Sequence, residues 1–372
     1  MSSCPQSYPA QNLSAFVTTI IQWQKQHGRH HLPWQKTRDA YRIWLSEIML
    51  QQTQVSTVID YYQRFLERFP TLQDLAQADQ AQVMPYWAGL GYYARARNLH
   101  KCAQAVQADH GGSFPEDPEV IATLPGIGRS TAGAIAAFAY GVRTPIMDGN
   151  VKRVFTRYFG IAGYPGNTKV EKTLWALAHN VLDAAPATLD IAAYTQGLMD
   201  LGSGPCARRN PSCEQCPLSQ SCHARMHGLQ NQLPTPKPRA EVPVRSCHML
   251  ILLNDDAVLL EQRPDSGIWG GLWSLPEFDS PTALAAYCVQ RGVATAPQRM
   301  GGLQHVFTHF KLDITPWQVN ATSPTTSEAE PQRQWFDLQH WPALALPAPV
   351  KKILAGLAQP SLISAPTAPD VG

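Results

Sequence analysis

The sequence lacks any apolar run of about 18 residues, the length at which a helix begins to span a bilayer, and it contains no internal repeat. Residues 1–9 are polar and have neither a basic region nor an apolar core, so they do not resemble a secretory leader. These absences argue against an integral membrane protein and a repeat array. We expect two or three domains that work in the cytoplasm without a membrane partner.

A strong charge of either sign is also missing, because the formal net charge of the 372 residues is only +2. Residues 1–225 hold 20 Lys and Arg against 16 Asp and Glu, whereas residues 226–372 hold 10 against 12. An anionic partner would therefore favour the first part of the chain. The small net charge does not exclude nucleic acid, since backbone amides also bind phosphates.

Cysteine is sparse, but four of the 8 cysteines gather in one short segment, at Cys206, Cys213, Cys216 and Cys222. Clustered thiolates indicate a soft-metal site, because the negative sulfurs repel one another unless a cation neutralises them. One close pair with an outlying cysteine on each side favours a [4Fe–4S] cluster over structural zinc, whose ligands usually form two close pairs. Zinc stays an alternative at this point, and disulfides are the weaker one because cytosolic thiols are reduced.

Residues 10–225 carry apolar residues at helical spacing in one segment after another, with Gly and Pro between the segments. This pattern predicts an all-α domain that ends in the cysteine loop. The stretches Met1–Pro9 and 359–372 are predicted to be disordered. Helices are expected at Leu13–Ile21, Ile43–Leu50, Leu99–Val106, Ile135–Phe138, Val151–Phe159, Leu174–Leu182 and Ile191–Leu201.

A proline-rich linker is predicted over residues 226–244, and the character of the chain changes beyond it. Short strand-like runs and one helical segment follow, which predicts a smaller α+β domain over residues 245–358. The strands are expected at Cys247–Leu253, Ala257–Glu261, Val306–Lys311 and Trp335–Leu338, and the helix at Ala283–Gln290.

The string Leu124-Pro125-Gly126-Ile127-Gly128 lies between two helical segments. The glycines allow a tight turn, and free amides at the start of the next helix favour a phosphate oxygen. A lone Gly-x-Gly would be an ordinary connector, but the whole string is the signature of a helix-hairpin-helix DNA-binding element. We therefore expect Leu124, Gly126, Ile127 and Gly128 to bind a DNA backbone.

Two carboxylates are candidates for chemistry. Glu47 stands among large apolar residues in a helical segment, where a solvent-facing position is the ordinary interpretation. In a desolvated pocket, however, its pKa would rise and it could donate a proton near neutral pH. Asp148 and Asn150 can cap the helix that begins near Val151, or Asp148 could stabilise positive charge that develops on a sugar.

These strings together resemble the MutY family of adenine-specific DNA glycosylases, within the endonuclease III superfamily. The resemblance covers most of residues 30–225 in consistent order, from Leu32-Pro33-Trp34-Gln35 to the four cysteines. It implies an all-α helix-hairpin-helix glycosylase domain with an iron–sulfur loop that holds one [4Fe–4S] cluster. It also implies a monomer that binds double-stranded DNA in the cytoplasm, at the nucleoid.

The implied reaction is removal of adenine mispaired with 8-oxoguanine or guanine, after the base has been flipped out of the duplex. By this resemblance Glu47 protonates the adenine, Asp148 stabilises the oxocarbenium-like sugar, and Asn150 orients the site. The pair of carboxylates parallels the acid and the charge stabiliser of glycoside hydrolases.

The resemblance assigns further residues around the flipped base. Leu32, Trp34 and Gln196 would line the adenine pocket, whereas Gln52 and Tyr92 would enter the duplex. Ser130 is a departure within the superfamily, because bifunctional members carry a lysine there that forms a Schiff base and cuts the strand. Serine predicts a monofunctional enzyme. The alternative is an endonuclease III-like glycosylase and lyase that acts on oxidised pyrimidines.

The second domain resembles the MutT-like module of the same family, which has a Nudix fold. Gly271–Glu277 echoes the start of a Nudix box, but Ala285–Cys288 stands where the box requires acidic residues, so no magnesium site for pyrophosphate cleavage is expected. The string Phe307-Thr308-His309 matches the loop with which the family detects 8-oxoguanine. A nucleotide pyrophosphatase and a non-enzymatic mismatch sensor are the remaining alternatives.

Overall fold

The computed structural model describes residues 9–238, 242–264, 267–307, 309–321 and 332–357. The chain divides into two compact units, one made of Met1–Val83 with Arg95–Arg239 and the other of Met84–Ala94 with Ala240–Gly372. The predicted disorder of the two chain ends falls almost wholly outside the described residues. The predicted domain boundaries stay predictions. Among the described residues, no helix is both long and apolar enough to cross a membrane.

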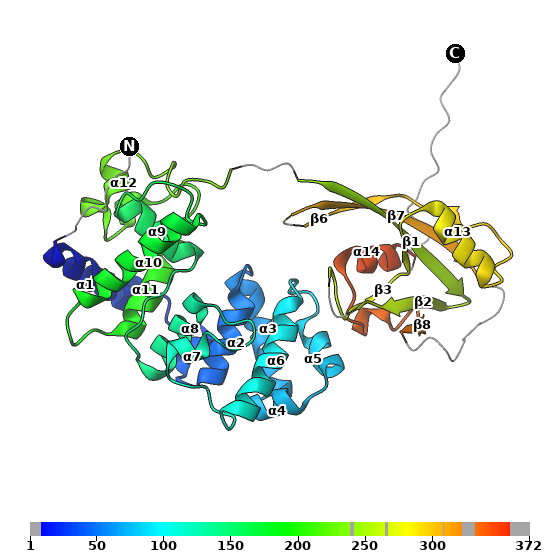
Figure 1. The fold of residues 1–372 in the computed structure, drawn as a ribbon, viewed down its shortest axis with the longest axis horizontal. Helices are drawn as coiled ribbons and strands as arrows, with labels where there is room; N and C mark the ends of the chain where they lie inside the picture. Colours follow the sequence, from blue (N-terminus) through cyan, green and yellow to red (C-terminus); the bar gives the residue numbers. More distant parts are fainter. Residues whose placement is uncertain (1–8, 239–241, 265–266, 308, 322–331, 358–372) are drawn as a thin grey trace, which may run out of the picture. The chain divides into compact units, whose positions relative to one another are not determined.

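The first unit is helical (Figure 1), as the sequence predicts. Each expected helical segment lies within or across an observed helix or helical turn. The helices are α1 (Ala10–His27), α2 (Ala40–Leu50), α3 (Val55–Arg68), α4 (Leu72–Gln77), α5 (Gln80–Trp87), α6 (Ala94–Asp109), α7 (Pro118–Ile121), α8 (Arg129–Ile135), α9 (Gly149–Tyr158), α10 (Thr168–Asp183), α11 (Ile191–Ser203) and α12 (His223–Met226), and both α5 and α6 cross a boundary between the units.

In this unit the predicted segments do not include helices α3, α4, α5, α7 and α12. Helix α3 buries Val58, Tyr62 and Phe65, which recur at helical spacing on one face. Its remaining positions are mostly polar or charged, so a search for dense apolar runs passes over it. Helix α4 has only six residues, and Thr71 caps it by accepting the amide of Asp74 at 3.2 Å.

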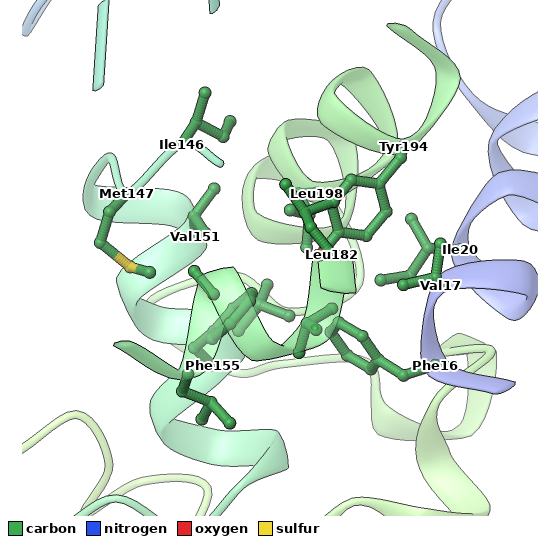
Figure 2. Close-up of a cluster of buried hydrophobic side chains, with 14 of the residues drawn as sticks. Phe16, Val17, Ile20, Ile146, Met147, Val151, Phe155, Leu182, Tyr194 and Leu198 are labelled. Carbon is green, nitrogen blue, oxygen red and sulfur yellow. The ribbon is translucent and has the colours of Figure 1, made fainter. Parts of the chain in front are cut away.

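The core of the first unit joins α1, α9 and α11 (Figure 2). Phe16 of α1 packs edge-on against Phe155 of α9, with 5.7 Å between the ring centroids. Tyr194 and Leu198 of α11 lie buried in the same cluster. This packing fixes the start of α9, where Asp148 lies, relative to the helix that carries Gln196.

Among its described residues, the second unit is built on one mixed sheet of eight strands in which β1 and β7 pair in parallel. The central order is β3-β2-β1-β7-β5, with β4 beside β1, β6 beside β7 and β8 beside β2. The elements are β1 (Val244–Asn254), β2 (Ala257–Gln262), β3 (Trp273–Ser274), β4 (Glu277–Phe278), β5 (Gln298–Arg299), β6 (Leu303–Val306), β7 (Lys311–Asn320) and β8 (Arg333–Asp337), with the helices α13 (Pro281–Gln290) and α14 (Ala348–Leu357).

Both faces of the central strand β1 are buried, because successive side chains point to opposite faces. Leu250 and Leu252 pack with Leu284 of α13 on one face, and Met249 and Ile251 are buried on the other. Figure 1 shows α13 and α14 on either side of the strands around β1. The result is the predicted α+β unit.

The predicted hairpin between β1 and β2 is confirmed, and Asp255 takes the left-handed conformation in its turn with φ +49°. The strand predicted at Val306–Lys311 is wrong, because β6 ends at Val306 and β7 begins at Lys311. The chain turns between these two strands, where the amide of Phe307 donates to the carbonyl of Phe310 at 2.9 Å. The apolar and aromatic residues that indicated a strand lie in this turn.

Candidate active site and cysteine loop

A cavity of about 340 Å³ lies beside α2 in the first unit. Its volume is within the range of small-molecule pockets, and its lining combines apolar side chains with polar and charged ones. Four predicted site residues lie around it, namely Leu32, Trp34, Glu47 and Gln196. The cavity therefore gathers residues that are far apart in the sequence.

Glu47 faces this cavity from the middle of α2, where its neighbours Trp44 and Ile48 are buried. Burial raises the pKa of Glu47 from 4.5 to about 8, and the negative charge of nearby Asp148 adds to the shift. A carboxyl group with this pKa is largely protonated at neutral pH. It is therefore equipped to act as a general acid.

Asp148 caps α9, and its carboxylate accepts the amide of Val151 at 2.7 Å and the side-chain amide of Asn150 at 3.4 Å. Burial raises the pKa of Asp148, while these hydrogen bonds oppose the shift. The capping role and a role in chemistry are thus compatible, because the same geometry holds the carboxylate near Glu47. Ser130 accepts the amide of Met147 at 2.9 Å and so ties the segment before Asp148 to α8.

Asp200 of α11 is a buried acid that sequence reasoning missed. It is only 4% exposed and forms an ion pair with Arg29, whose Nε lies 2.7 Å and whose backbone amide lies 3.0 Å from its oxygens. Asp200 also accepts the side-chain amide of Gln196 at 2.9 Å. It therefore fixes both Gln196 and the segment that leads to Leu32. The spacing of four residues between Gln196 and Asp200 was the available signal, since it places both on one helix face.

Arg153 of α9 connects the start of that helix to the cysteine loop. Its Nη2 donates to the side-chain oxygen of Asn150 at 2.8 Å, and its Nε donates to the carbonyl of Cys206 at 2.8 Å. The same guanidinium also donates to the carbonyl of Gly202. Asn150 thus has one polar partner in Asp148 and another in Arg153, a link that the sequence alone did not indicate.

The four cysteines form no disulfide with one another, and together they line two small adjoining cavities. Buried Arg157 extends over this loop and donates to the sulfur of Cys206 at 3.3 Å and to the carbonyl of Ala207 at 2.8 Å. Burial raises the pKa of Cys216 to about 12, and the neighbouring cysteines add to the shift. Four sulfurs in this setting become thiolates only when a cation neutralises them.

The hairpin residues lie between α7 and α8 in the way that the motif requires. Leu124 and Ile127 are buried, and Gly126 takes a left-handed φ of +75°. A Cβ at Gly126 would lie 2.6 Å from the Cβ of Asn98, so only glycine fits this turn without a shift. The first hydrogen bond of α8 runs from the amide of Ala132 to the carbonyl of Gly128. The backbone amides that come before it, in the first turn of the helix, can donate to a phosphate oxygen.

Gln52 and Tyr92 do not line the cavity, but they share an unusual backbone. Both are exposed and take a left-handed conformation, with φ of +58° and +48°. Bulky residues in this conformation carry strain of about 1 kcal/mol or more, which gathers at functional sites. Arg95 holds the turn before Gln52 by donating to the carbonyls of Met49 and Gln51 at 2.9 and 2.6 Å.

In the second unit, Phe307 and His309 lie at the turn after β6, and Thr308 is outside the described residues. Phe307 is half-buried and stacks on Phe310, whereas His309 is exposed. Helix α13 contains no carboxylate, and Glu277 forms an ion pair with Arg263.

The fold and the pocket define a class of protein, the base-excision DNA glycosylases. Residues 45–180 match the model of the HhH-GPD superfamily of base excision DNA repair proteins, and residues 248–356 match the model of the NUDIX domain. A thermostable thymine-DNA glycosylase of known structure is 31% identical to this chain with a TM-score of 0.53. The match spans 59% of this chain and 100% of that one.

Curated relatives narrow the class to one family. The adenine DNA glycosylase of Buchnera aphidicola from Schizaphis graminum is 34% identical over 91% of this chain and 97% of its own length. The human adenine DNA glycosylase is 32% identical over 92% of this chain and 73% of its own length. The chain belongs to the adenine DNA glycosylase (MutY) family, with a C-terminal Nudix-like domain, and is a base-excision repair enzyme that binds DNA and acts on adenine. The predicted family, fold class and enzyme class are confirmed.

Proposed function

We propose that this enzyme removes adenine mispaired with 8-oxoguanine or guanine in duplex DNA, hydrolyses the N-glycosidic bond and leaves an abasic site. The observation that carries this proposal is the buried carboxyl of Glu47, which faces the cavity with a pKa of about 8 and has Asp148 within electrostatic reach. We further propose that it acts as a monomer in the cytoplasm, at the nucleoid, where its substrate lies.

In this reaction Glu47 donates its proton to the flipped adenine, so that the base departs as a neutral molecule. Asp148 stays ionised and stabilises the positive charge that develops on the sugar. The hydrogen bonds from Val151 and Asn150 favour the charged form of Asp148. The contrast between a protonated and an ionised carboxyl is the usual basis for dividing acid and stabiliser roles.

The partners of Gln196 support recognition of adenine. The carboxylate of Asp200 can only accept, so the side-chain amide of Gln196 must direct its NH2 group toward Asp200. The oxygen of Gln196 is then available as an acceptor for the amino group of adenine. A base with a carbonyl oxygen at that position would leave two acceptors facing each other, which a polar pocket rejects strongly. Leu32 and Trp34 provide the apolar walls.

Ser130 supports a monofunctional reaction. Its hydroxyl accepts the amide of Met147 and offers no amine that could form a Schiff base with the sugar. Water therefore completes the reaction, and the DNA strand stays intact.

The first unit offers several groups to DNA. The amides that follow Gly128 would bind a backbone phosphate. Arg208 and Arg209 are exposed beside the cysteine loop and can meet other phosphates. Gln52, and Tyr92 of the second unit, would enter the duplex where the flipped base had stacked, and both residues are exposed.

We propose that Cys206, Cys213, Cys216 and Cys222 hold one [4Fe–4S] cluster. The four partly buried sulfurs fit a cationic group, and burial raises the pKa of two of them, Cys216 and Cys222. One close pair of cysteines with an outlying cysteine on each side favours this cluster over a single zinc ion, whose ligands usually form two close pairs. The cluster would be a structural crosslink of the loop, and Arg153 would connect that loop to Asn150.

The turn after β6 is the proposed reader of 8-oxoguanine, through Phe307, Thr308 and His309. The exposed His309 supports this role in the described part of the turn. The absence of carboxylates on α13 supports a unit that recognises a base and does not cleave a pyrophosphate.

The test uses the pure protein and duplexes in which adenine lies opposite 8-oxoguanine, guanine, cytosine or thymine. We expect release of free adenine from the first two, and strand breaks at those sites only after alkali. A Ser130→Ala variant should also give strand breaks only after alkali, with a lower rate because Met147 loses its hydrogen-bond acceptor. Strand cutting without alkali, together with borohydride trapping of enzyme on DNA, would instead identify a lyase.

A further inference from the structure

Trp269 occupies an unusual position in the second unit. Its side chain is 9% exposed, and its backbone takes a left-handed φ of +57° although it is a bulky residue. Such strain persists only where the surrounding structure determines the conformation, and it often marks a functional position. The question is which contacts require a tryptophan here.

The ring of Trp269 contacts the aromatic residues that lead into the turn after β6. Its centroid lies 5.6 Å from that of His305 and 5.3 Å from that of Phe307. His305 also meets Phe307 edge-on at 4.6 Å, and burial lowers the pKa of His305, so this ring is neutral at neutral pH. Two rings thus support Phe307 from the preceding strand and from the loop around Trp269.

Phe307 is further packed against Phe310 at the other end of the turn. The two rings stack at 4.5 Å with 23° between their planes, and the guanidinium of Arg245 lies 4.7 Å from the ring of Phe310. His309 contacts the ring of Phe310 at 4.9 Å. The orientation of Phe307 and His309 therefore depends on a connected set of rings, in which Trp269 comes from a distant segment.

The loop that carries Trp269 is itself held by Arg263. The backbone of Arg263 bonds to Leu272 and Gly271 at 2.9 and 3.2 Å, and its Nε donates to the carbonyl of Ile268 at 3.1 Å. The guanidinium lies 5.8 Å from the Trp269 ring and pairs with Glu277. Helix α13 has no carboxylate that could bind a metal ion together with Glu277. Glu277 instead pairs with Arg263, the residue that holds this loop.

We propose that Trp269 is a positioning residue that holds Phe307 and His309 in the orientation needed to read the base opposite adenine. It thereby sets the preference for 8-oxoguanine over guanine. This inference rests on the proposed role of the turn after β6. The pair of Arg263 and Glu277 contributes by fixing the loop of Trp269.

The test compares single-turnover rates of adenine release by the full chain on duplexes with 8-oxoguanine or guanine opposite adenine. An aromatic pair contributes about 0.5–1.5 kcal/mol, so Trp269→Leu should lower the ratio of the two rates about twofold to tenfold. The rate opposite guanine should stay unchanged. Trp269→Phe keeps an aromatic ring and should restore most of the preference.

A purely structural role would lower thermal stability and both rates together and leave their ratio unchanged. That result would overturn the inference. The matched control is Trp273→Leu, because Trp273 packs on Phe336 in the same unit at 4.9 Å, and its loss should not change the ratio. If Trp269→Leu does not fold, His305→Ala removes a ring that contacts both Trp269 and Phe307 and carries the same expectation.

Phe307→Ala separates this inference from the proposed function. Loss of preference in Phe307→Ala but not in Trp269→Leu or His305→Ala would reject the positioning role alone. An unchanged preference in Phe307→Ala would reject the recognition role of the turn, and the positioning role with it.

Discussion

The cavity beside Glu47 and the turn after β6 are built from different kinds of contact. The cavity is lined by Glu47, whose pKa is raised by burial, and by Gln196, whose side-chain amide is oriented by Asp200. The turn is a set of packed rings in which burial keeps His305 neutral. Bond cleavage requires a proton and a fixed charge in a desolvated place, whereas base recognition requires a surface of defined shape. Substitutions in the cavity should therefore change the rate of adenine release on every duplex, whereas substitutions in the turn should change the preference for the opposite base by a smaller factor.

The largest effect is expected from Glu47→Gln, which removes the proton donor from the cavity. General acids contribute about 100- to 10,000-fold to rates, so adenine release should fall by that factor on every duplex. DNA binding should remain, because glutamine preserves the shape of the side chain. Single-turnover rates and a binding titration check both statements. Undiminished release in this variant would remove Glu47 from the role of acid.

Cys213→Ala should cost folding and DNA affinity before it affects the chemical step. The expected loss is seen as absent cluster absorbance, a lower melting temperature and weaker binding of a mismatched duplex. Cys102→Ala is a matched control, because Cys102 is buried in α6 and lies outside the cysteine loop. A Cys213→Ala protein that loses its cluster yet folds and binds DNA normally would contradict this role.

Asp200→Asn breaks the buried ion pair with Arg29 and loosens the orientation of Gln196. Because Arg29 is partly exposed and water can replace part of its partner, the loss of these charged hydrogen bonds costs about 1–3 kcal/mol of stability, and a clear fall in melting temperature is expected. The rate at which adenine is released should fall with it, while discrimination between opposite bases stays the same. Asp190→Asn is the control, because Asp190 pairs with Lys25 at an exposed site. Equal effects of the two substitutions would contradict a special role for Asp200.

The pH dependence of the reaction should follow Glu47. With a pKa of about 8, the carboxyl is protonated at neutral pH, and activity should fall about tenfold per unit as pH rises well above 8. The unfolded chain loses this proton near 4.5, so the contribution of Glu47 to stability also declines as pH rises from 4.5 to about 8. Glu47→Gln should remove this component of the stability profile. A rate that increases through pH 8 would contradict the acid role.

The smallest effect is expected from Phe307→Ala, which removes a ring from the turn. The rate opposite guanine should remain near that of the unsubstituted enzyme, and the rate opposite 8-oxoguanine should fall about threefold to tenfold. Phe336→Ala is the control within the same unit. A fall of equal size on both duplexes would make Phe307 a structural residue.

The sequence predicted the helical and α+β units, the hairpin, and four residues that the structure gathers around one cavity. Their roles in catalysis stay predictions. The ion pair of Asp200 was not predicted, because its partner Arg29 lies 171 positions away and only the four-residue spacing from Gln196 is a local signal. The link made by Arg153 was not predicted either, because its partner Cys206 is 53 positions further along the chain. The strand predicted at Val306–Lys311 failed because strand propensity does not distinguish a pleated strand from a turn packed by the same aromatic residues.

One measurement tests most directly whether the cavity beside Glu47 controls bond cleavage and the turn after β6 controls recognition of the opposite base. Single-turnover rates on duplexes with 8-oxoguanine or guanine opposite adenine are compared for the unsubstituted enzyme, Glu47→Gln and Phe307→Ala. If the two regions have these separate roles, Glu47→Gln lowers both rates by the same large factor. Phe307→Ala lowers the rate opposite 8-oxoguanine and leaves the rate opposite guanine near its original value. A Glu47→Gln enzyme that retains its rate on either duplex, or a Phe307→Ala enzyme with both rates equally reduced, would contradict these separate roles.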